Sequence, residues 1–316
     1  MANKKVSIVV PCYNEEEMIP LFYYEVLDLF QHELIDYDYE IIFVDDGSRD
    51  NSLGKMKELQ VIDENVNYIS FSRNFGKESA LYAGLEHTTG DYVSVMDVDL
   101  QDPPEMLIDM IKGIEKDGFD VVGCRRTSRE GEPVIRSFFA RKFYKIINKI
   151  TDTEIVDGAR DFRLMTRQVT NSILDVSEYN RFSKGIFSWV GYKTKYLEYK
   201  NVERVAGETS WNFWSLLKYS IDGIVAFSDA PLVLASFMGL LSCLGSGIGI
   251  VWIVIDKLLN GNPVSGWASL VCIILFMGGL NLFFMGIFGK YIGKIFTEVK
   301  NRPIYIVRDS NLTKKD

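Results

Sequence analysis

The chain has 316 residues, which exceeds the size of one typical domain, and 47% of them are hydrophobic. Its 35 lysines and arginines against 43 aspartates and glutamates leave a net charge of −8. This charge argues against a nucleic-acid-binding protein because no general basic field would attract a phosphate backbone. The four cysteines form no CxxC pair and no disulfide-framework spacing, so we expect packed thiols in a reducing compartment.

The N-terminal part of the chain alternates apolar, β-branched runs with segments of helical spacing. We expect strands at residues 6–10, 40–46, 67–72, 92–97 and 119–124 and helices at residues 15–30, 52–60, 77–87 and 104–116. Strands that are apolar on both faces and alternate with helices are typical of a parallel sheet covered by helices. The predicted fold class is therefore α/β, doubly wound.

The segments at the ends of the first four expected strands are polar, and each contains a carboxylate. They read PCYNEEE, DDGSRDNS, SRNFGKES and DVDLQDPP. Ligands bind at the carboxyl ends of the strands in such sheets, so these segments predict a shared site. None is a GxGxxG or P-loop sequence, and both histidines, His32 and His87, lie away from them. We expect a nucleotide-sized site without a glycine-rich phosphate loop and without a histidine mechanism.

Asp97 and Asp99 flank a single residue at the end of the fourth expected strand, so in an extended chain both carboxylates point to the same side. Two carboxylates this close repel each other unless one is protonated or a cation lies between them. Mg²⁺ or Mn²⁺ would remove that conflict and leave positions for substrate phosphates, with Gln101 as a further oxygen ligand. Two solvated carboxylates in a loop are the alternative, and the position among other polar strand ends favours the cation.

Two long apolar stretches follow residue 227, at residues 232–255 and 267–288. Each is long enough to cross a hydrocarbon core of about 30 Å as a helix, whereas buried core helices seldom run so long without charge. The segment between them carries one cation, Lys257, and five lysines and arginines lie between residues 290 and 308. This asymmetry predicts a multi-pass protein of the cell membrane with both termini in the cytoplasm. Residues 1–10 lack the hydrophobic region of a signal peptide, in keeping with that prediction.

Five segments, VVPCYNEEE, VDDGSRDNS, SRNFGK, MDVDLQDPPE and DFRLM, are followed by RVAGETSW and the two apolar stretches. In this order, over essentially the whole chain, they resemble the family 2 glycosyltransferases of the polyprenyl-phosphate glycosyltransferase type. That group includes dolichol-phosphate mannose synthase and the bactoprenol glucosyltransferases. The resemblance implies a GT-A fold, a nucleotide-sugar donor, Mg²⁺ or Mn²⁺ as cofactor, inversion at the anomeric carbon and a polyprenyl phosphate acceptor. Processive synthases of the family carry a QxxRW motif that this sequence lacks.

Matching the motifs residue by residue implies a nucleotide-sugar site and a metal site. The nucleotide-sugar residues are Pro11, Tyr13, Asn14, Glu15, Asp46, Arg73, Lys77 and Asp97, and the metal ligands are Asp97, Asp99 and Gln101. Taken alone, residues 46–48 also suit a turn, and residues 14–15 also suit the start of a helix. We interpret residues 102–105 as the start of the next helix, with proline in its first turn.

An ionised acceptor phosphate needs little help from a base, but its binding requires positive charge, which arginine side chains supply best. The resemblance implies this role for Arg125, Arg136 and Arg204, with Arg163 beside them. Each is also compatible with a surface arginine, which is what we expect of Arg126.

The acidic catalytic position has two candidates because the motif differs in length from that of the relatives. Relatives commonly read DTGDFRL where this chain reads DGARDFRL, one residue longer. Either Asp157 or Asp161 therefore takes the family's acidic position close to the acceptor and the donor sugar, and we favour Asp157.

Residues 136–150 and 211–227 each carry apolar side chains on one helical face, and the first segment has cations on the opposite face. Helices of this kind lie in the membrane interface, although packing against the protein's own core has the same periodicity. We favour the interface because a polyprenyl tail cannot leave the bilayer cheaply. Asn281, within the second apolar stretch, predicts a hydrogen bond between helices of an oligomer. The expected domains are residues 1–210 (GT-A glycosyltransferase), 211–230 (interfacial linker), 231–290 (two transmembrane helices) and 291–316 (cytosolic basic tail).

The resemblance, together with the two apolar stretches, implies a membrane enzyme that transfers a hexose, with glucose favoured, from a UDP-sugar to undecaprenyl phosphate at the cytoplasmic membrane face, for modification of cell-envelope glycans. The alternatives within enzymes are transfer of mannose from GDP-mannose and transfer of an amino sugar to the same lipid. A non-catalytic membrane scaffold on the same fold is the other class. Against it stand the intact residues Asp97, Asp99, Gln101, Arg136 and Arg204.

Overall fold

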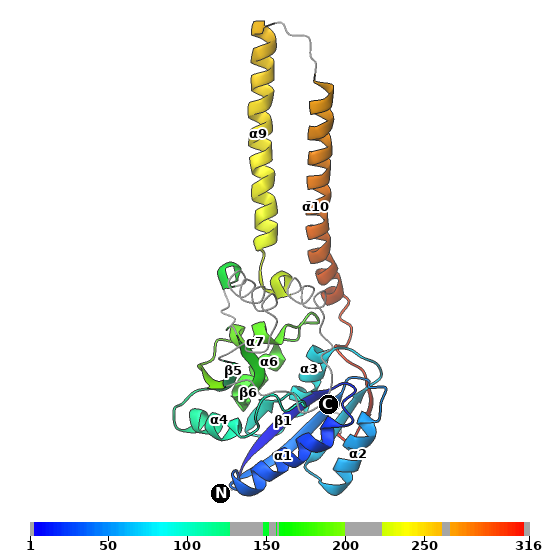
Figure 1. Ribbon diagram of the computed structural model, residues 1–316, viewed down its shortest axis with the longest axis vertical. Helices are drawn as coiled ribbons and strands as arrows, with labels where there is room; N and C mark the ends of the chain where they lie inside the picture. The colour runs from blue at the N-terminus through cyan, green and yellow to red at the C-terminus, as the bar shows by residue number, and fades with distance from the viewer. Residues whose placement is uncertain are drawn as a thin grey trace. The chain divides into compact units, whose positions relative to one another are not determined.

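The computed structural model describes residues 3–126, 148–151, 156, 158–199, 223–260 and 266–312. The chain, drawn in Figure 1, forms two compact units. The first unit combines Met1–Ser220 with Arg302–Asp316, and the second unit is Ile221–Asn301. The predicted strand ends belong to the first unit, and the long apolar helices belong to the second.

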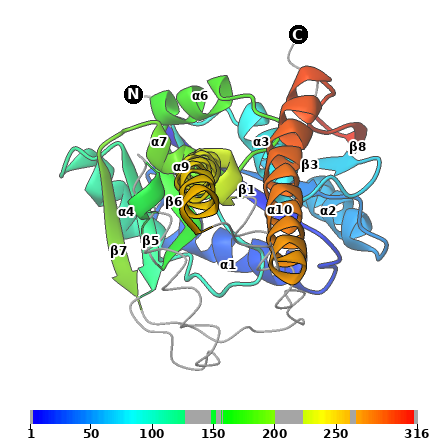
Figure 2. The ribbon, with the colours of Figure 1, turned by 90° about the horizontal axis from the view of Figure 1, so that it is seen from above.

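The first unit is built on a mostly parallel sheet whose strands lie in the order β7-β5-β6-β4-β1-β2-β3-β8. The strands are β1 Lys4–Cys12, β2 Tyr37–Asp45, β3 Val66–Phe71, β4 Tyr92–Val95, β5 Val121–Arg126, β6 Ala159–Thr166, β7 Thr194–Tyr199 and β8 Val307–Ser310. The central strand β1 pairs in parallel with β2 and β4. Antiparallel pairing occurs where β6 lies between β4 and β5. It also occurs where β8 lies beside β3 (Figure 2).

Helices cover both faces of this sheet. They are α1 Met18–His32, α2 Ser52–Ile62, α3 Lys77–His87, α4 Met106–Glu115, α6 Arg167–Asp175 and α7 Ser183–Trp189. Alternate residues of β2 point to opposite faces: Ile41 and Phe43 belong to the core under α1, α2 and α4, whereas Ile42 and Val44 belong to the core under α3. Burial on both faces explains why the central strands are apolar at nearly every position.

The α/β fold class predicted from the sequence is confirmed, and the expected strands and helices of the N-terminal part are present, all but α3 with shifted ends. One shift concerns the site: β4 ends at Val95 rather than at Asp97. Leu100 has a φ of 52°, so the chain turns after Asp97 instead of continuing the strand. Strands β6, β7 and β8 come in addition to those expected.

The second unit contains two long apolar helices, α9 Ala230–Asn260 and α10 Trp267–Val299. The candidate membrane spans within them are Ala230–Asp256 and Ser269–Val299. At about 1.5 Å per residue, both spans exceed the roughly 30 Å of a hydrocarbon core. Length and composition are therefore those of membrane-associated helices.

Residues 291–316, for which we expected a basic tail, continue α10 to Val299 and then form β8, which belongs to the first unit. The two expected interface helices lie largely outside the described residues. Of residues 136–150 the structure describes 148–150, and of residues 211–227 it describes 223–227.

Candidate active site

Two buried carboxylates lie where β2 ends: Asp45 is its last residue, and Asp46 is the first residue after it. Asp45 accepts a hydrogen bond from the Ser48 main-chain N–H at 2.8 Å. Asp46 accepts from the main-chain N–H groups of Phe75, at 2.6 Å, and Gly76, at 2.9 Å. Burial raises the pKa of Asp46 to about 6, although the two N–H donors favour its charged form. A rigid, poorly solvated carboxylate thus lies at the carboxyl end of β2.

The loops after β2 and β3 touch each other next to this carboxylate. Gly47 has a φ of +70°, and a Cβ atom at this position would lie 2.5 Å from the main-chain carbon of Arg73. Only glycine fits such a turn without strain. The Arg73 guanidinium lies over the Phe75 ring, 4.2 Å from its centroid. The structure thus places two expected nucleotide residues, Asp46 and Arg73, in adjacent loops.

Pro11 lies near the end of β1. The loop after β1 carries Tyr13, Asn14 and Glu15 and is hydrogen-bonded to the loop after β2. Asn14 has a φ of 56°, which asparagine tolerates better than most residues. Its main-chain N–H donates to the Ser48 hydroxyl at 2.9 Å. Tyr13 is exposed and Pro11 is half-buried. The structure therefore brings this loop beside Asp46. Asn14 also has a structural role, because its positive φ allows the chain to turn after β1.

Lys77, the first residue of α3, joins two expected site residues. Its ammonium lies 2.7 Å from Asp97 Oδ1 and 2.6 Å from Asp161 Oδ2. Burial disfavours the charges, but the carboxylates raise the pKa of Lys77, and Lys77 in turn lowers the pKa of Asp161. Lys77 and Asp161 therefore stay charged near neutral pH, and one ammonium links β6 to the turn after β4.

Asp99 is buried and Gln101 is half-buried in the turn after β4. The Gln101 main-chain N–H donates to Asp99 Oδ1 at 3.2 Å. Gln101 Oε1 accepts a hydrogen bond from Arg126 Nη2 at 3.2 Å. Our expectation of a surface role for Arg126 was therefore wrong: the side chain is half-buried and holds the amide of Gln101.

A further buried carboxylate, Asp102, has a role that the sequence interpretation missed. We expected it to begin the next helix, but α4 begins at Met106, and Arg160 Nε lies 3.1 Å from Asp102 Oδ1. The Tyr199 hydroxyl donates to the same carboxylate and accepts from Arg126 Nε at 3.4 Å. Burial raises the pKa of Asp102 against the effect of Arg160. The network joins β5, β6 and β7 to the turn that carries Asp99 and Gln101.

The expected acceptor arginines differ in their surroundings. Arg163 is buried: its Nε donates to the Asp161 carbonyl at 3.2 Å, and its guanidinium lies 3.8 Å from the centroid of the Phe187 ring. Arg125 is half-buried at the carboxyl end of β5. The expected residues that lie outside the described part of the chain are Arg136, Asp157 and Arg204.

Comparison with known proteins identifies the family to which the chain belongs. The sequence profile described as "Glycosyl transferase family 2" matches residues 7–174, from β1 to α6. The chain belongs to glycosyltransferase family 2. The family and the enzyme class predicted from the sequence are therefore confirmed.

Relatives of this family 2 glycosyltransferase match along nearly the whole chain. The bactoprenol glucosyl transferase of Shigella phage SfII is 45% identical over 307 residues, which cover 97% of this chain and 98% of the phage protein. The prophage bactoprenol glucosyl transferase homolog of Escherichia coli (strain K12) is 43% identical over 304 residues, covering 96% and 98%. The solved structure of mannosyltransferase PcManGT from Pyrobaculum calidifontis in complex with GDP-Man and Mn²⁺ has a TM-score of 0.48 at 15% identity, covering 95% of this chain and 88% of that chain.

In this glycosyltransferase, Asp97 and Asp99 have the ligand chemistry that a hard divalent cation requires. The described residues contain no group of three or more acidic, histidine or cysteine side chains that could hold an ion. Carboxylate oxygens are the ligands that suit Mg²⁺ or Mn²⁺ bound together with substrate phosphates. The Lys77 ammonium, 2.7 Å from Asp97, shows that a positive charge is accommodated there. Gln101 Oε1 would have to leave Arg126 to become a ligand.

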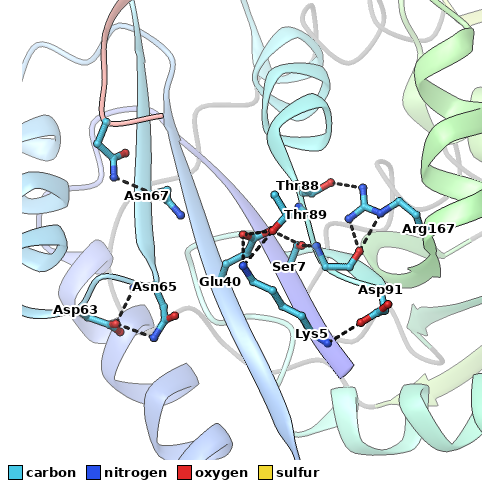
Figure 3. Close-up of polar contacts among 12 residues, drawn as sticks. Lys5, Ser7, Glu40, Asp63, Asn65, Asn67, Thr88, Thr89, Asp91 and Arg167 are labelled. Atoms are coloured by element: carbon cyan, nitrogen blue, oxygen red, sulfur yellow. Dashed lines mark hydrogen bonds and ion pairs between the residues drawn. The ribbon is translucent and has the colours of Figure 1, made fainter. Parts of the chain in front are cut away.

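A separate polar cluster of the glycosyltransferase lies around the amino-terminal parts of β1 and β4 (Figure 3). The buried Glu40 accepts from the Ser7 hydroxyl at 2.5 Å and the Thr89 main-chain N–H at 2.6 Å, and it pairs with Lys5 Nζ at 2.7 Å. Burial opposes the charge of Glu40, but these partners hold its pKa below the usual value. Because the carboxylate is satisfied within the protein, this cluster stabilises the sheet and needs no ligand.

Proposed function

We propose that this enzyme transfers glucose from UDP-glucose to undecaprenyl phosphate at the cytoplasmic face of the cell membrane. The observation that carries the proposal is the match to a bactoprenol glucosyl transferase, 45% identical over 97% of this chain. The match covers both the strand-end loops and the two long apolar helices. A soluble sugar nucleotide and a membrane lipid require both parts.

The loops after β1, β2 and β3 form the donor site in this proposal. Asp46 would accept hydrogen bonds from the nucleoside, because the Phe75 and Gly76 N–H groups hold its carboxylate rigidly and its burial strengthens any hydrogen bond that it accepts. Arg73 and Lys77 would contact the diphosphate. The other proposed nucleotide-sugar residues are Pro11, Tyr13, Asn14, Glu15 and Asp97.

Asp97 and Asp99 are the proposed ligands of Mg²⁺ or Mn²⁺, with Gln101 as a third ligand if it leaves Arg126. When bound, the ion supplies positive charge for the departing diphosphate. Lys77 lies beside this position, 2.7 Å from Asp97, and contributes a second positive charge on the leaving-group side. Asp161 holds the Lys77 ammonium from β6 and so keeps it oriented towards the site.

The proposed reaction is a single displacement. An oxygen of the acceptor phosphate attacks C1 of glucose, the bond between C1 and the β-phosphate oxygen breaks, and UDP leaves with the electron pair. Attack opposite to the leaving group inverts the configuration at C1. Because the acceptor oxygen is already ionised near neutral pH, catalysis depends on positioning and on charge rather than on a strong base.

The acceptor phosphate needs cations near the carboxyl ends of β5 and β6. Arg125 is half-buried at the end of β5, where it pairs with Ala159 of β6. We leave Arg163 out of the acceptor site because its guanidinium is buried against Phe187 and bonded to the main chain. Asp157 stays our proposal for the acidic group next to the acceptor, with Asp161 as the alternative. The proposed phosphate ligands are Arg125, Arg136 and Arg204.

The second unit serves as the membrane anchor in this proposal, with both chain termini in the cytoplasm. Withdrawing a polyprenyl tail from lipid costs about 0.8 kcal/mol per CH₂ group, so the enzyme must act at the bilayer surface. The cations between residues 290 and 308, against the single Lys257 between the two candidate membrane spans, favour this orientation. Residues 136–150 and 211–227 are proposed to lie in the membrane interface, and Asn281 to contact a neighbouring helix in an oligomer.

A donor comparison tests the proposal. The purified full chain in detergent is incubated with undecaprenyl phosphate, Mn²⁺ and one labelled donor at a time: UDP-glucose, UDP-N-acetylglucosamine or GDP-mannose. We expect labelled lipid with UDP-glucose. If labelled lipid forms only with one of the other donors, the transferred sugar is not glucose. If no donor gives labelled lipid and the protein binds no nucleotide, the proposed function is excluded.

A further inference from the structure

We call residues 302–312 the C-terminal strap; they follow the second unit in the sequence and belong to the first. Strand β8 of the strap pairs antiparallel with β3 and forms an edge of the sheet. The Ser72 main-chain N–H donates to the Ile306 carbonyl at 2.9 Å. The Asn311 side chain accepts from the Tyr68 main-chain N–H at 2.8 Å. The strap is therefore fastened along β3 and to the first residue beyond it.

Tyr305 precedes β8 and packs where β3 ends. Its ring stacks on Phe71, with centroids 5.0 Å apart and an interplanar angle of 21°. Its hydroxyl donates to Glu86 Oε2, on α3, at 2.5 Å. One side chain of the strap thus contacts both the end of β3 and the helix that begins at Lys77.

The aromatic contacts continue from Tyr305 into the loop after β3. Phe75 meets Phe71 edge to face, with centroids 5.7 Å apart and an interplanar angle of 89°. The N–H groups of Phe75 and Gly76 are the ones that donate to Asp46. A continuous set of contacts therefore runs from the strap to the buried carboxylate of the proposed donor site.

The loop after β3 comprises residues 72–76. Residues 72–74 are exposed, and Gly76, with a φ of +99°, bends the chain sharply before α3. Exposed loops depend on the elements at their ends for a fixed conformation. Here Asp46 holds the loop on one side, and the stack of Tyr305 and Phe71 supports Phe75 on the other.

We propose that Tyr305 is a positioning residue for the sugar-nucleotide donor. Through Phe71 and Phe75, the strap keeps residues 72–76 in the conformation that presents Arg73 and Lys77 to the diphosphate. The inference rests on the donor site of the proposed function. Tyr305 follows α10 after residues 300–304. If Tyr305 positions the donor, the segment that follows the second membrane helix takes part in donor binding.

The test compares Tyr305→Ala with Tyr305→Phe and with the matched control Lys57→Met, which removes an exposed ion pair to Asp309 of the same strap. Calorimetry measures the UDP affinity of the full chain in detergent. We expect Tyr305→Ala to bind UDP about fivefold more weakly, because it loses an aromatic pair worth about 1 kcal/mol. Tyr305→Phe keeps the ring, so it should stay within about twofold of the wild type, as should Lys57→Met. In turnover, the KM for UDP-glucose should rise and the KM for the lipid should not.

Hydrogen exchange without nucleotide separates positioning from general loss of stability. In Tyr305→Ala, peptides covering residues 72–77 should exchange faster, while peptides covering residues 88–91, in the cluster of Figure 3, should not change. If peptides from both regions exchange faster in Tyr305→Ala, the same two sets of peptides are compared in Tyr305→Leu, which keeps most of the apolar volume. Faster exchange in the strap alone, with unchanged UDP affinity, overturns the inference. A wild type that binds no UDP overturns the proposed function instead, and the exchange comparison still decides the role of Tyr305.

Discussion

Replacing Lys77 by methionine tests how charge is balanced at the site. Methionine has an apolar side chain of similar length to lysine. The substitution therefore removes only the ammonium that lies 2.7 Å from Asp97 and 2.6 Å from Asp161. The two carboxylates then face each other without a cation, and their repulsion destabilises the folded first unit. We expect a loss of stability that a divalent cation reverses.

The size of this loss follows from the exposure of the three groups. The side chain of Lys77 is 42% exposed, and those of Asp97 and Asp161 are 23% and 16% exposed. An exposed ion pair contributes about 0.2–1 kcal/mol, whereas breaking a buried pair costs about 3–5 kcal/mol. Because solvent screens the Lys77 ammonium, we expect a loss of about 1–3 kcal/mol. For a unit of this size, that loss lowers the melting temperature by about 3–9 °C.

Thermal unfolding of the full chain in detergent, followed by intrinsic fluorescence with and without Mn²⁺, measures the effect. Lys57→Met is the matched control because Lys57 forms an exposed ion pair with Asp309 and contacts no site residue named above. Mn²⁺ should raise the melting temperature of Lys77→Met more than that of the wild type, since Mn²⁺ no longer competes with the ammonium for Asp97. The reasoning is refuted if Lys77→Met melts no lower than Lys57→Met, or if Mn²⁺ shifts the variant and the wild type equally.

Four further experiments test other parts of the site. Asp99→Ala should lower glucosyl transfer more than about 100-fold, because losing a metal ligand should cost more activity than losing a residue that only supports a ligand. The melting temperature of this variant in EDTA should stay near that of the wild type. Wild-type turnover would show that Asp99 is not a metal ligand. Burial raises the pKa of Asp46 to about 6, above its value in the unfolded chain, so the stability that this proton contributes is complete below about pH 4 and is lost as the pH rises through 6. Asp46→Asn should abolish this part of the pH dependence of unfolding and weaken UDP binding about tenfold at pH 7, and an unchanged pH profile would contradict the assignment. Arg160→Met leaves the buried Asp102 without its cation, so the free energy of unfolding should fall by about 3 kcal/mol. The fall should be much smaller when Asp102→Asn is combined with Arg160→Met. If the effects of the two substitutions simply add, Arg160 and Asp102 do not form a stabilising ion pair. Arg125→Ala should raise the KM for the lipid phosphate about tenfold and leave the KM for UDP-glucose unchanged, whereas equal changes in both would argue against an acceptor role.

The fold could be predicted where its signals are local. Strands β1 to β5 each have a run of buried apolar residues, and α3 begins and ends at the expected residues, Lys77 and His87. β7 and β8 are edge strands with no fully buried residue, so they lack the apolar run that marks a central strand. The position of β6 between β4 and β5 depends on pairs such as Val93 with Met165, which are distant in the sequence.

The site was predictable to the extent that it consists of strand ends. Asp46, Lys77, Asp97 and Asp99 follow parallel strands, whose carboxyl ends meet at one edge of the sheet, so the sequence order alone indicates that they converge. Asp102 gave no such indication because Arg160 and Tyr199 lie 58 and 97 residues away. The same holds for Tyr305, whose partner Phe71 lies in another part of the sequence and whose surroundings are aromatic rather than charged.

Mass spectrometry of the lipid product tests the proposed reaction itself. With UDP-glucose, undecaprenyl phosphate and Mn²⁺, the wild type should form one undecaprenyl phosphate that carries a single hexose for each UDP released, and Asp99→Ala should form neither product. Release of UDP without the hexosyl lipid, or equal amounts of that lipid from Asp99→Ala and the wild type, would contradict a metal-assisted transfer of glucose to the lipid phosphate.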